Sequence, residues 1–204
     1  MQSLRTDNER HYSYADYLNW NEGERWEIID GVPYMQATPS REHQGILMAL
    51  SAQFYNYLKG KTYRIYPAPF CVRLDAESDD KKVRNVLEPD ITIVCDSSKL
   101  DDKGCKGAPD MIVEVLSPST GKKDKLIKFN KYEKAGVKEY WIVEPESRLV
   151  NVFLLQPDGR YGRTEVYSDE DKIKVSIFED LEIDLKEIFE EEKASVEETA
   201  PGED

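Results

Sequence analysis

A glutamate inside an apolar, β-branched segment is the feature that most constrains how this chain can fold. Residues 111–116 read Met-Ile-Val-Glu-Val-Leu, and Glu114 stands in the middle of them. Burying an unpaired carboxylate in its charged form costs several kcal/mol or more, so such a residue usually has a cation beside it. A similar apolar segment at residues 90–94 begins with a second acid, Asp90. The two acids together indicate that the cation is a metal ion.

The two acids can share one ion if their strands are neighbours in a sheet. Asp110 is a poorer partner for Glu114, because it lies four residues earlier on the same strand, about 13 Å away at roughly 3.3 Å per residue. Two bonds of about 2–2.6 Å to one cation cannot bridge that distance. We therefore predict that Asp90 and Glu114 bind the metal and that Asp110 ends a loop or caps a strand. An all-oxygen site of this kind suits Mg²⁺ or Mn²⁺ rather than zinc.

The order of predicted elements indicates an α/β (α+β) fold with a mixed central β-sheet, flanking helices and an antiparallel β extension. Asp30-Gly31 predicts a hairpin turn, Ser40 predicts the start of a long amphipathic helix, and Gly136 predicts the end of a later helix. The expected strands are residues 25–29, 32–37, 63–74, 90–95, 110–116, 139–144, 150–155, 161–167 and 172–175. The expected helices are residues 13–20, 40–59, 122–135 and 185–190, and residues 75–88 and 96–108 are expected to be loops.

Composition is typical of a single globular domain. The chain has 204 residues, of which 39% are hydrophobic, and we expect one domain over residues 12–190 and a disordered acidic tail at 191–204. No apolar run approaches the roughly 20 residues that span a bilayer, so no membrane segment is expected. The three cysteines lack CxxC spacing, which favours reduced thiols and a cytoplasmic location.

The charge distribution bears on a nucleic-acid partner in two opposite ways. The net charge of −13 disfavours tight, non-specific binding to DNA. Residues 122–138, however, contain seven lysines and two acids, whereas residues 190–204 contain seven acids and one lysine. The lysine-rich face could contact phosphates, and a solvated helix surface is the alternative interpretation.

An ordered series of motifs resembles the PD-(D/E)XK nuclease superfamily, and more narrowly its bacterial restriction-endonuclease-like proteins. The resemblance runs from about Tyr14 to Pro145. Its landmarks are Trp-Glu-Ile-Ile-Asp-Gly at 26–31, Pro39 with His43, Pro89-Asp90, Glu-Val-Leu-Ser-Pro-Ser-Thr at 114–120, Asp124, Lys128 and Tyr132, and Gly-Val-Lys-Glu-Tyr-Trp-Ile-Val-Glu-Pro at 136–145. The resemblance implies a restriction endonuclease-like core, with Asp90 and Glu114 as metal ligands and Glu27 as a supporting acid.

One position departs from the superfamily pattern. The superfamily lysine falls two residues after the second acid, where this chain has Leu116. The resemblance places a lysine on the following helix instead, and Lys128 matches it. Such a lysine orients the attacking water or offsets charge on the scissile phosphate. Asp124, Lys128 and Tyr132 are spaced i, i+4 and i+8, so they form one helical stripe that could face the metal. The alternative is a surface lysine paired with Asp124.

Three other candidate residues each have a structural alternative. Glu27 lies on an alternating hairpin strand and could point to solvent instead of the site. His43 could approach the metal or a phosphate, or it could cap the long helix or pack in the core, and one histidine is no zinc site. Tyr132 is more typical of a packing residue than of a platform for base stacking.

These patterns predict a metal-dependent endonuclease that hydrolyses DNA phosphodiester bonds with Mg²⁺ or Mn²⁺. The alternative is a catalytically inactive nuclease-fold protein that acts as a binding or assembly module, which Leu116 and the acidic composition favour. A homodimer is a further expectation, because cutting two strands needs two sites and the apolar C-terminal strands could supply an interface.

Overall fold

The computed structural model describes residues 10–20, 23–117 and 123–189, and of Lys123 and Asp124 it describes only the backbone. The helices are α1 (Tyr14–Tyr17), α2 (Arg41–Leu58), α3 (Phe129–Ala135) and α4 (Lys186–Phe189), with a 3₁₀ turn at Ser97–Lys99 and a π-helical segment at Lys123–Lys128 that leads into α3. The strands are β1 (Trp26–Ile29), β2 (Val32–Met35), β3 (Arg64–Pro67), β4 (Val72–Arg73), β5 (Val86–Leu87), β6 (Ile91–Val94), β7 (Leu100–Asp101), β8 (Gly104–Lys106), β9 (Met111–Val115), β10 (Glu139–Glu144), β11 (Leu149–Leu154), β12 (Glu165–Ser168), β13 (Lys172–Lys174) and β14 (Glu182–Asp184).

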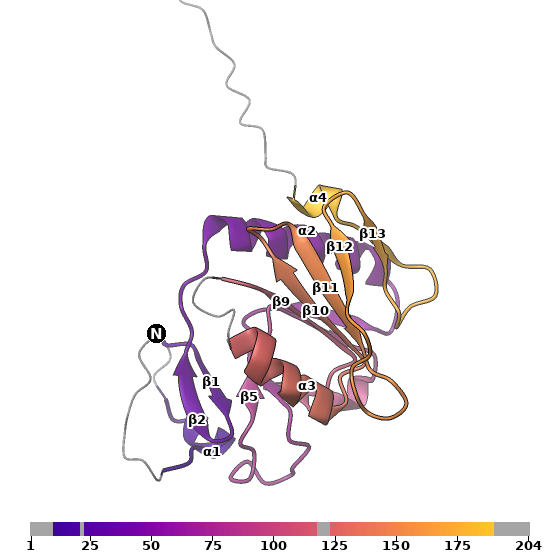
Figure 1. The fold of residues 1–204 in the computed structure, drawn as a ribbon. Helices are drawn as coiled ribbons and strands as arrows, with labels where there is room; N and C mark the ends of the chain where they lie inside the picture. The colour runs from indigo at the N-terminus through magenta and orange to yellow at the C-terminus, as the bar shows by residue number, and fades with distance from the viewer. Residues whose placement is uncertain (1–9, 21–22, 118–122, 190–204) are drawn as a thin grey trace, which may run out of the picture.

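A mixed six-stranded sheet with the order β12-β11-β10-β9-β6-β3 forms the centre of the fold (Figure 1). Only β9 and β10 run parallel, and every other pair in this sheet is antiparallel. Alternate residues of β9 point to opposite faces. Val113 packs in the core that contains the buried hydrophobic residues of α2, and Ile112 packs in the core that contains Tyr132 of α3. The two helices therefore cover opposite faces, and the predicted mixed sheet with flanking helices and an antiparallel extension is confirmed.

A second six-stranded sheet, with the order β2-β1-β5-β4-β8-β7, stands beside the central one. Its first hairpin turns at Asp30 and Gly31, which have φ angles of 52° and 79°. These positive values explain the Asp-Gly sequence, because glycine and aspartate adopt the left-handed region most readily. The hairpin places Glu27 on β1, next to the central sheet.

The expectation of a single strand at residues 63–74, with a bulge or edge at Pro67 and Pro69, is wrong. Residues 64–67 form β3, which pairs with β6 in the central sheet, whereas Val72 and Arg73 form β4 in the second sheet. Pro67 and Pro69 lack the N–H groups that a continuous strand would need. The expected loops at 75–88 and 96–108 also contain short strands, β5, β7 and β8. Strands of two or three residues are too short for alternation to reveal them.

The two helices that frame the site begin and end as their capping residues predict. The Ser40 hydroxyl accepts a 3.1 Å hydrogen bond from the backbone N–H of His43, which fixes the first turn of α2. Gly136 ends α3 with a left-handed φ of 88°. The first cap sets the position of His43, and the second helix carries Tyr132 directly after the segment that contains Lys128.

Two of the broader expectations can be compared with the described residues. Among them, no helix is both long and apolar enough to cross a membrane. The thiols of Cys71, Cys95 and Cys105 are all free. The predicted acidic tail at 191–204 lies outside the described residues, and the single domain at 12–190 stays a prediction.

Candidate active site

A cleft of about 610 Å³ opens where β6 begins and β9 ends. The central sheet contributes Asp90 and Glu114 to its wall, and the first turn of α2 contributes His43. The chain just before β1 and just after β5 contributes Arg25 and Glu88. Segments far apart in the sequence thus meet at one end of the central sheet.

The two acids predicted to share an ion lie where two neighbouring strands meet, Asp90 directly before β6 and Glu114 on β9. β6 and β9 are antiparallel, with Ile91 opposite Val113. Extending this register by one residue sets Asp90 opposite Glu114. Directly opposed residues on antiparallel strands lie on the same face, with Cβ atoms about 4.5–5.5 Å apart. The strand neighbourhood that the prediction required is therefore present.

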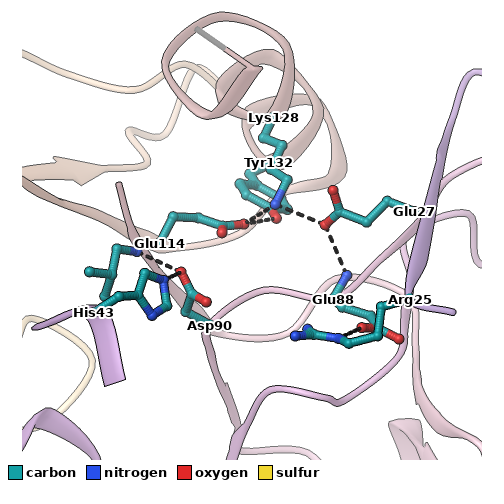
Figure 2. Close-up of polar contacts among 9 residues, drawn as sticks. Arg25, Glu27, His43, Glu88, Asp90, Glu114, Lys128 and Tyr132 are labelled. Atoms are coloured by element: carbon teal, nitrogen blue, oxygen red, sulfur yellow. Dashed lines mark hydrogen bonds and ion pairs between the residues drawn. The ribbon is translucent and has the colours of Figure 1, made fainter. Parts of the chain in front are cut away.

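Glu114 meets a cation and a hydroxyl from the helix that follows it. The Lys128 ammonium lies 2.8 Å from Oε1 of Glu114 and 2.8 Å from Oε1 of Glu27. The Tyr132 hydroxyl donates a 2.6 Å hydrogen bond to Oε1 of Glu114. Figure 2 shows Lys128 between the two glutamates, with Tyr132 directed at Glu114.

Burial of this group decides between the alternatives for Lys128 and Glu27. Lys128 is only 2% exposed, so the interpretation as a surface lysine is wrong. Glu27 is fully buried and does not point to solvent. Its Oε1 also accepts a 3.1 Å hydrogen bond from the backbone N–H of Glu88. The side chain of Asp124, the third predicted member of the helical stripe, lies outside the described residues.

Tyr132 serves Glu114 as a neutral hydrogen-bond donor. Burial raises the pKa of Tyr132 well above 10, and the negative charges of Glu114 and Glu27 raise it further. Its ring packs against Tyr140 at a centroid distance of 5.0 Å. The expected packing role is confirmed, and the contact with Glu114 adds a polar one.

Asp90 is held at the other side of the cleft. Its Oδ2 accepts a 2.7 Å hydrogen bond from the backbone N–H of Val115 and lies 3.3 Å from Nε2 of His43. Burial lowers the pKa of His43, but the hydrogen bond and charge of Asp90 outweigh burial, so the net shift is upward. The Asp90 side chain is 17% exposed, and no described residue forms a hydrogen bond or ion pair with its Oδ1. One oxygen of this carboxylate is therefore available to a ligand in the cleft.

A family model matches the part of the chain that contains these cleft residues. A family model described as "Putative restriction endonuclease", the Uma2 family, matches residues 14–186. The chain belongs to the Uma2 family. An "Uncharacterized protein" of Synechocystis sp. is 29% identical over 150 residues, which are 72% of this chain and 76% of that protein.

A solved structure supports the same fold. The crystal structure of "a putative nuclease belonging to DUF820" from Anabaena variabilis superimposes with a TM-score of 0.68, covering 87% of this chain and 97% of that one at 20% identity. At this identity the likeness shows the fold alone. The resemblance to the restriction-endonuclease-like proteins is thus confirmed for the family and for the fold.

The donor set of this Uma2 protein fits a hard divalent cation. Among the described side chains, no group of three or more His, Cys, Asp or Glu residues could hold a metal ion. Mg²⁺ does not need one, because it keeps several waters and binds through one or two carboxylates and substrate phosphates. Asp90 and Glu114 supply two carboxylates on the cleft wall, and the partly exposed side chain of Asp90 suits this kind of site. Zinc would require more protein ligands than these.

Two cleft residues that pair with each other, Arg25 and Glu88, are not among the residues predicted from the sequence. Nε of Arg25 donates a 3.0 Å hydrogen bond to Oε2 of Glu88, and the Tyr17 hydroxyl donates one of 3.0 Å to Oε1. Glu88 immediately precedes the Pro89-Asp90 motif, so its position next to a proposed ligand was a usable signal. The pairing with Arg25 had no such signal, because 63 residues separate the two.

Proposed function

We propose that this protein is a metal-dependent endonuclease that hydrolyses DNA phosphodiester bonds. The observation that carries the proposal is the 2.8 Å contact between the buried Lys128 ammonium and Glu114. It supplies a cation beside the second acid, although Leu116 occupies the usual lysine position. The family description "Putative restriction endonuclease" supports the same reaction class, and the described fold is compatible with it.

In this proposal Asp90 and Glu114 hold Mg²⁺ or Mn²⁺. When bound, such an ion polarises a phosphoryl oxygen and lowers the pKa of a coordinated water. Lys128 lies between two carboxylates, so it acts as an ammonium that donates hydrogen bonds. Its role is therefore to orient the attacking water and to offset negative charge that develops on the phosphate.

The remaining buried groups fix the orientation of these three. Glu27 binds the Lys128 ammonium from the side opposite Glu114, and Tyr132 holds Glu114 through its hydroxyl. The Val115 N–H and the His43 ring hold Oδ2 of Asp90. A cleft prepared in this way loses little free energy to reorganisation during the reaction. Cleavage of both DNA strands by a homodimer stays a prediction.

The test is a cleavage assay on single- and double-stranded DNA with and without Mg²⁺ or Mn²⁺. The parent should cut only with a divalent ion, and Glu114→Gln should cut at least about 10²-fold more slowly, because several kcal/mol of charge stabilisation are lost. Glu182→Gln is the matched control, since Glu182 is exposed on β14 and does not line the cleft. Its rate should equal that of the parent.

A melting experiment separates metal binding from catalysis. Mn²⁺ should raise the melting temperature of the parent and leave that of Glu114→Gln unchanged, because a ligand that binds only the folded state stabilises it. Equal cleavage by the parent and Glu114→Gln would refute the proposal. Absence of both cleavage and the Mn²⁺ effect in the parent would favour the inactive binding module.

A further inference from the structure

Among the described residues, Arg25 is held in the cleft by a hydrogen bond through one of its nitrogens. The guanidinium carries five N–H donors in a planar fork. Nε bonds to Glu88, and no described residue forms a hydrogen bond or ion pair with the two terminal nitrogens. Arg25 lines the cleft, and Figure 2 shows its guanidinium extending from Glu88 toward the side of Asp90 and His43. The terminal nitrogens are thus left to a ligand in the cleft.

The partner of Arg25 is itself firmly held. The Glu88 side chain is 8% exposed, and both of its oxygens accept hydrogen bonds, one from Arg25 and the other from Tyr17. Burial raises the pKa of Tyr17, and so does the charge of Glu88. Tyr17 therefore stays a neutral donor. Glu88 can hold the guanidinium in place without occupying its terminal nitrogens.

Arg25 differs from the other basic residues of the cleft, most of whose charged residues are acidic. The acids on the cleft wall are Glu42, Glu88, Asp90, Glu114, Glu144 and Glu146, and the basic residues are Arg25, His43 and Lys128. Lys128 already contacts two carboxylates, and His43 contacts Asp90. A polyanion that enters this acidic cleft needs a cation whose hydrogen-bond donors are not already used by the protein. Arg25 is the lining residue whose donors point there without a protein acceptor in the described chain.

We propose that the terminal guanidinium nitrogens of Arg25 bind a backbone phosphate of the nucleic-acid substrate, next to the phosphate that is cleaved. The planar fork suits two parallel hydrogen bonds to phosphate oxygens, which a lysine ammonium cannot make. Glu88 acts as a positioning residue that sets the angle of the fork through Nε. The inference rests on the proposed nuclease function and names the group that holds its substrate.

The first test measures binding separately from cleavage. Affinity for a fluorescent DNA duplex is measured in EDTA over a range of salt concentrations, for the parent and Arg25→Met. Loss of a charged hydrogen-bond pair should weaken binding about tenfold or more. Loss of one phosphate contact should reduce the slope of log K against log salt by about 1. Arg163→Met is the control, because Arg163 is exposed and outside the cleft, and its affinity and salt slope should match the parent.

Two further variants separate phosphate binding from a structural role. Arg25→Lys keeps the charge but cannot bond Glu88 and a phosphate through one planar group, so its affinity should fall several-fold. Glu88→Gln keeps an acceptor for Nε and should weaken binding less than Arg25→Met. If Arg25→Met is unfolded at the assay temperature, the Arg25→Lys result decides. In cleavage assays Arg25→Met should raise KM and leave kcat within about threefold. A substitution that only disturbed packing would not change KM selectively in this way.

The outcomes distinguish this inference from the proposed function. If the parent cleaves DNA but both Arg25 variants bind with parental affinity and salt slope, the phosphate site is wrong and the nuclease proposal stands. If the parent binds DNA through Arg25 but never cleaves it with Mg²⁺ or Mn²⁺, the nuclease proposal is wrong and the phosphate site stands. If the parent does not bind DNA, the phosphate site is overturned.

Discussion

Two Pro-Asp dipeptides begin neighbouring strands, and their aspartates have opposite environments. Asp90 precedes β6 and Asp110 precedes β9. Asp90 lies in the cleft, 17% exposed, with one oxygen to which no described residue forms a hydrogen bond or ion pair. Asp110 is 4% exposed, and its oxygens accept 2.7 Å hydrogen bonds from the backbone N–H of Cys95 and the ammonium of Lys138. One aspartate is open to a ligand and the other is saturated by the protein.

Strand direction explains the difference. Because β6 and β9 are antiparallel, their first residues stand at opposite ends of the pair. The start of β6 therefore meets the end of β9, where Glu114 lies, and Asp110 meets the end of β6. The prediction that Asp110 ends a loop or caps a strand is confirmed by its bond to Cys95. A shared dipeptide thus acquires two roles from the topology alone.

The lysines at the two ends of the β6–β9 pair also differ in burial. Lys128 is buried and contacts two carboxylates, whereas the Lys138 side chain is 64% exposed and contacts one. A buried cation between acids is costly to remove, and an exposed ion pair is worth little. The cleft end should therefore depend on its lysine far more than the opposite end does.

Exchanging each aspartate for asparagine gives the largest contrast. Asp90→Asn should reduce Mg²⁺-dependent cleavage at least about 10³-fold, because it removes a proposed metal ligand and with it several kcal/mol of charge stabilisation. Asp110→Asn should cleave at a rate close to that of the parent, since Asp110 is remote from the cleft. Rates of duplex cleavage at saturating Mg²⁺ provide the measurement. Equal losses in the two variants would remove the functional distinction between the two ends.

Lys128→Met should give the largest change in stability. The substitution leaves Glu27 and Glu114 buried without their shared cation, and breaking such a buried pair costs about 3–5 kcal/mol. Urea denaturation at pH 7 measures the free energy of unfolding. Lys134→Met is the control on α3, the helix that directly follows Lys128, because Lys134 is exposed, and it should change stability by less than about 0.5 kcal/mol. A loss below about 1 kcal/mol in Lys128→Met would show that the two glutamates do not need the lysine.

Much of this arrangement could be predicted from local sequence. Asp30-Gly31, Ser40 and Gly136 each determine one backbone conformation through their own chemistry, and the hairpin and both helix ends appear where expected. Glu114 was informative for a related reason, because a buried acid demands a partner wherever the chain goes. Features that follow from one residue or one short segment can therefore be predicted from the sequence.

The rest depends on contacts between distant segments. Pro67 and Pro69 indicate an interruption, but nothing near them shows that the chain crosses from the central sheet to the second one. Arg25 and Glu88 meet only because β1 pairs with β5. Burial of Glu27 and Lys128 likewise follows from that sheet standing beside α3. Local patterns cannot encode these relations.

Acid should abolish the contribution of Asp110 to stability. Burial raises the pKa of Asp110, but the Lys138 ammonium and the Cys95 N–H outweigh it, so the pKa lies below its ordinary value of 3.8. A carboxyl with a lowered pKa stabilises the fold above its unfolded-state pKa and loses that effect as pH falls through the folded-state value. Asp110→Ala should therefore cost about 1–3 kcal/mol at pH 5–8.

The same difference should shrink as the pH falls below about 3.8, the ordinary value for an aspartate. Urea titrations of the parent and Asp110→Ala between pH 2 and 8 measure it. A difference that stays constant down to pH 2 would mean that the charge of Asp110 contributes nothing. A difference that grows in acid would mean that its pKa is raised rather than lowered.

Lys138→Met should have the smallest effect of the series. Its ammonium contacts Asp110 at 2.7 Å, and this contact raises the pKa of Lys138. Most of the side chain is exposed, so screening limits the pair to about 0.2–1 kcal/mol. The Cys95 N–H still satisfies Asp110 in the variant. The loss should decrease further in 1 M NaCl, where the Debye length falls to about 3 Å. A loss as large as that of Lys128→Met, insensitive to salt, would show that the two ends of the strand pair depend equally on their lysines.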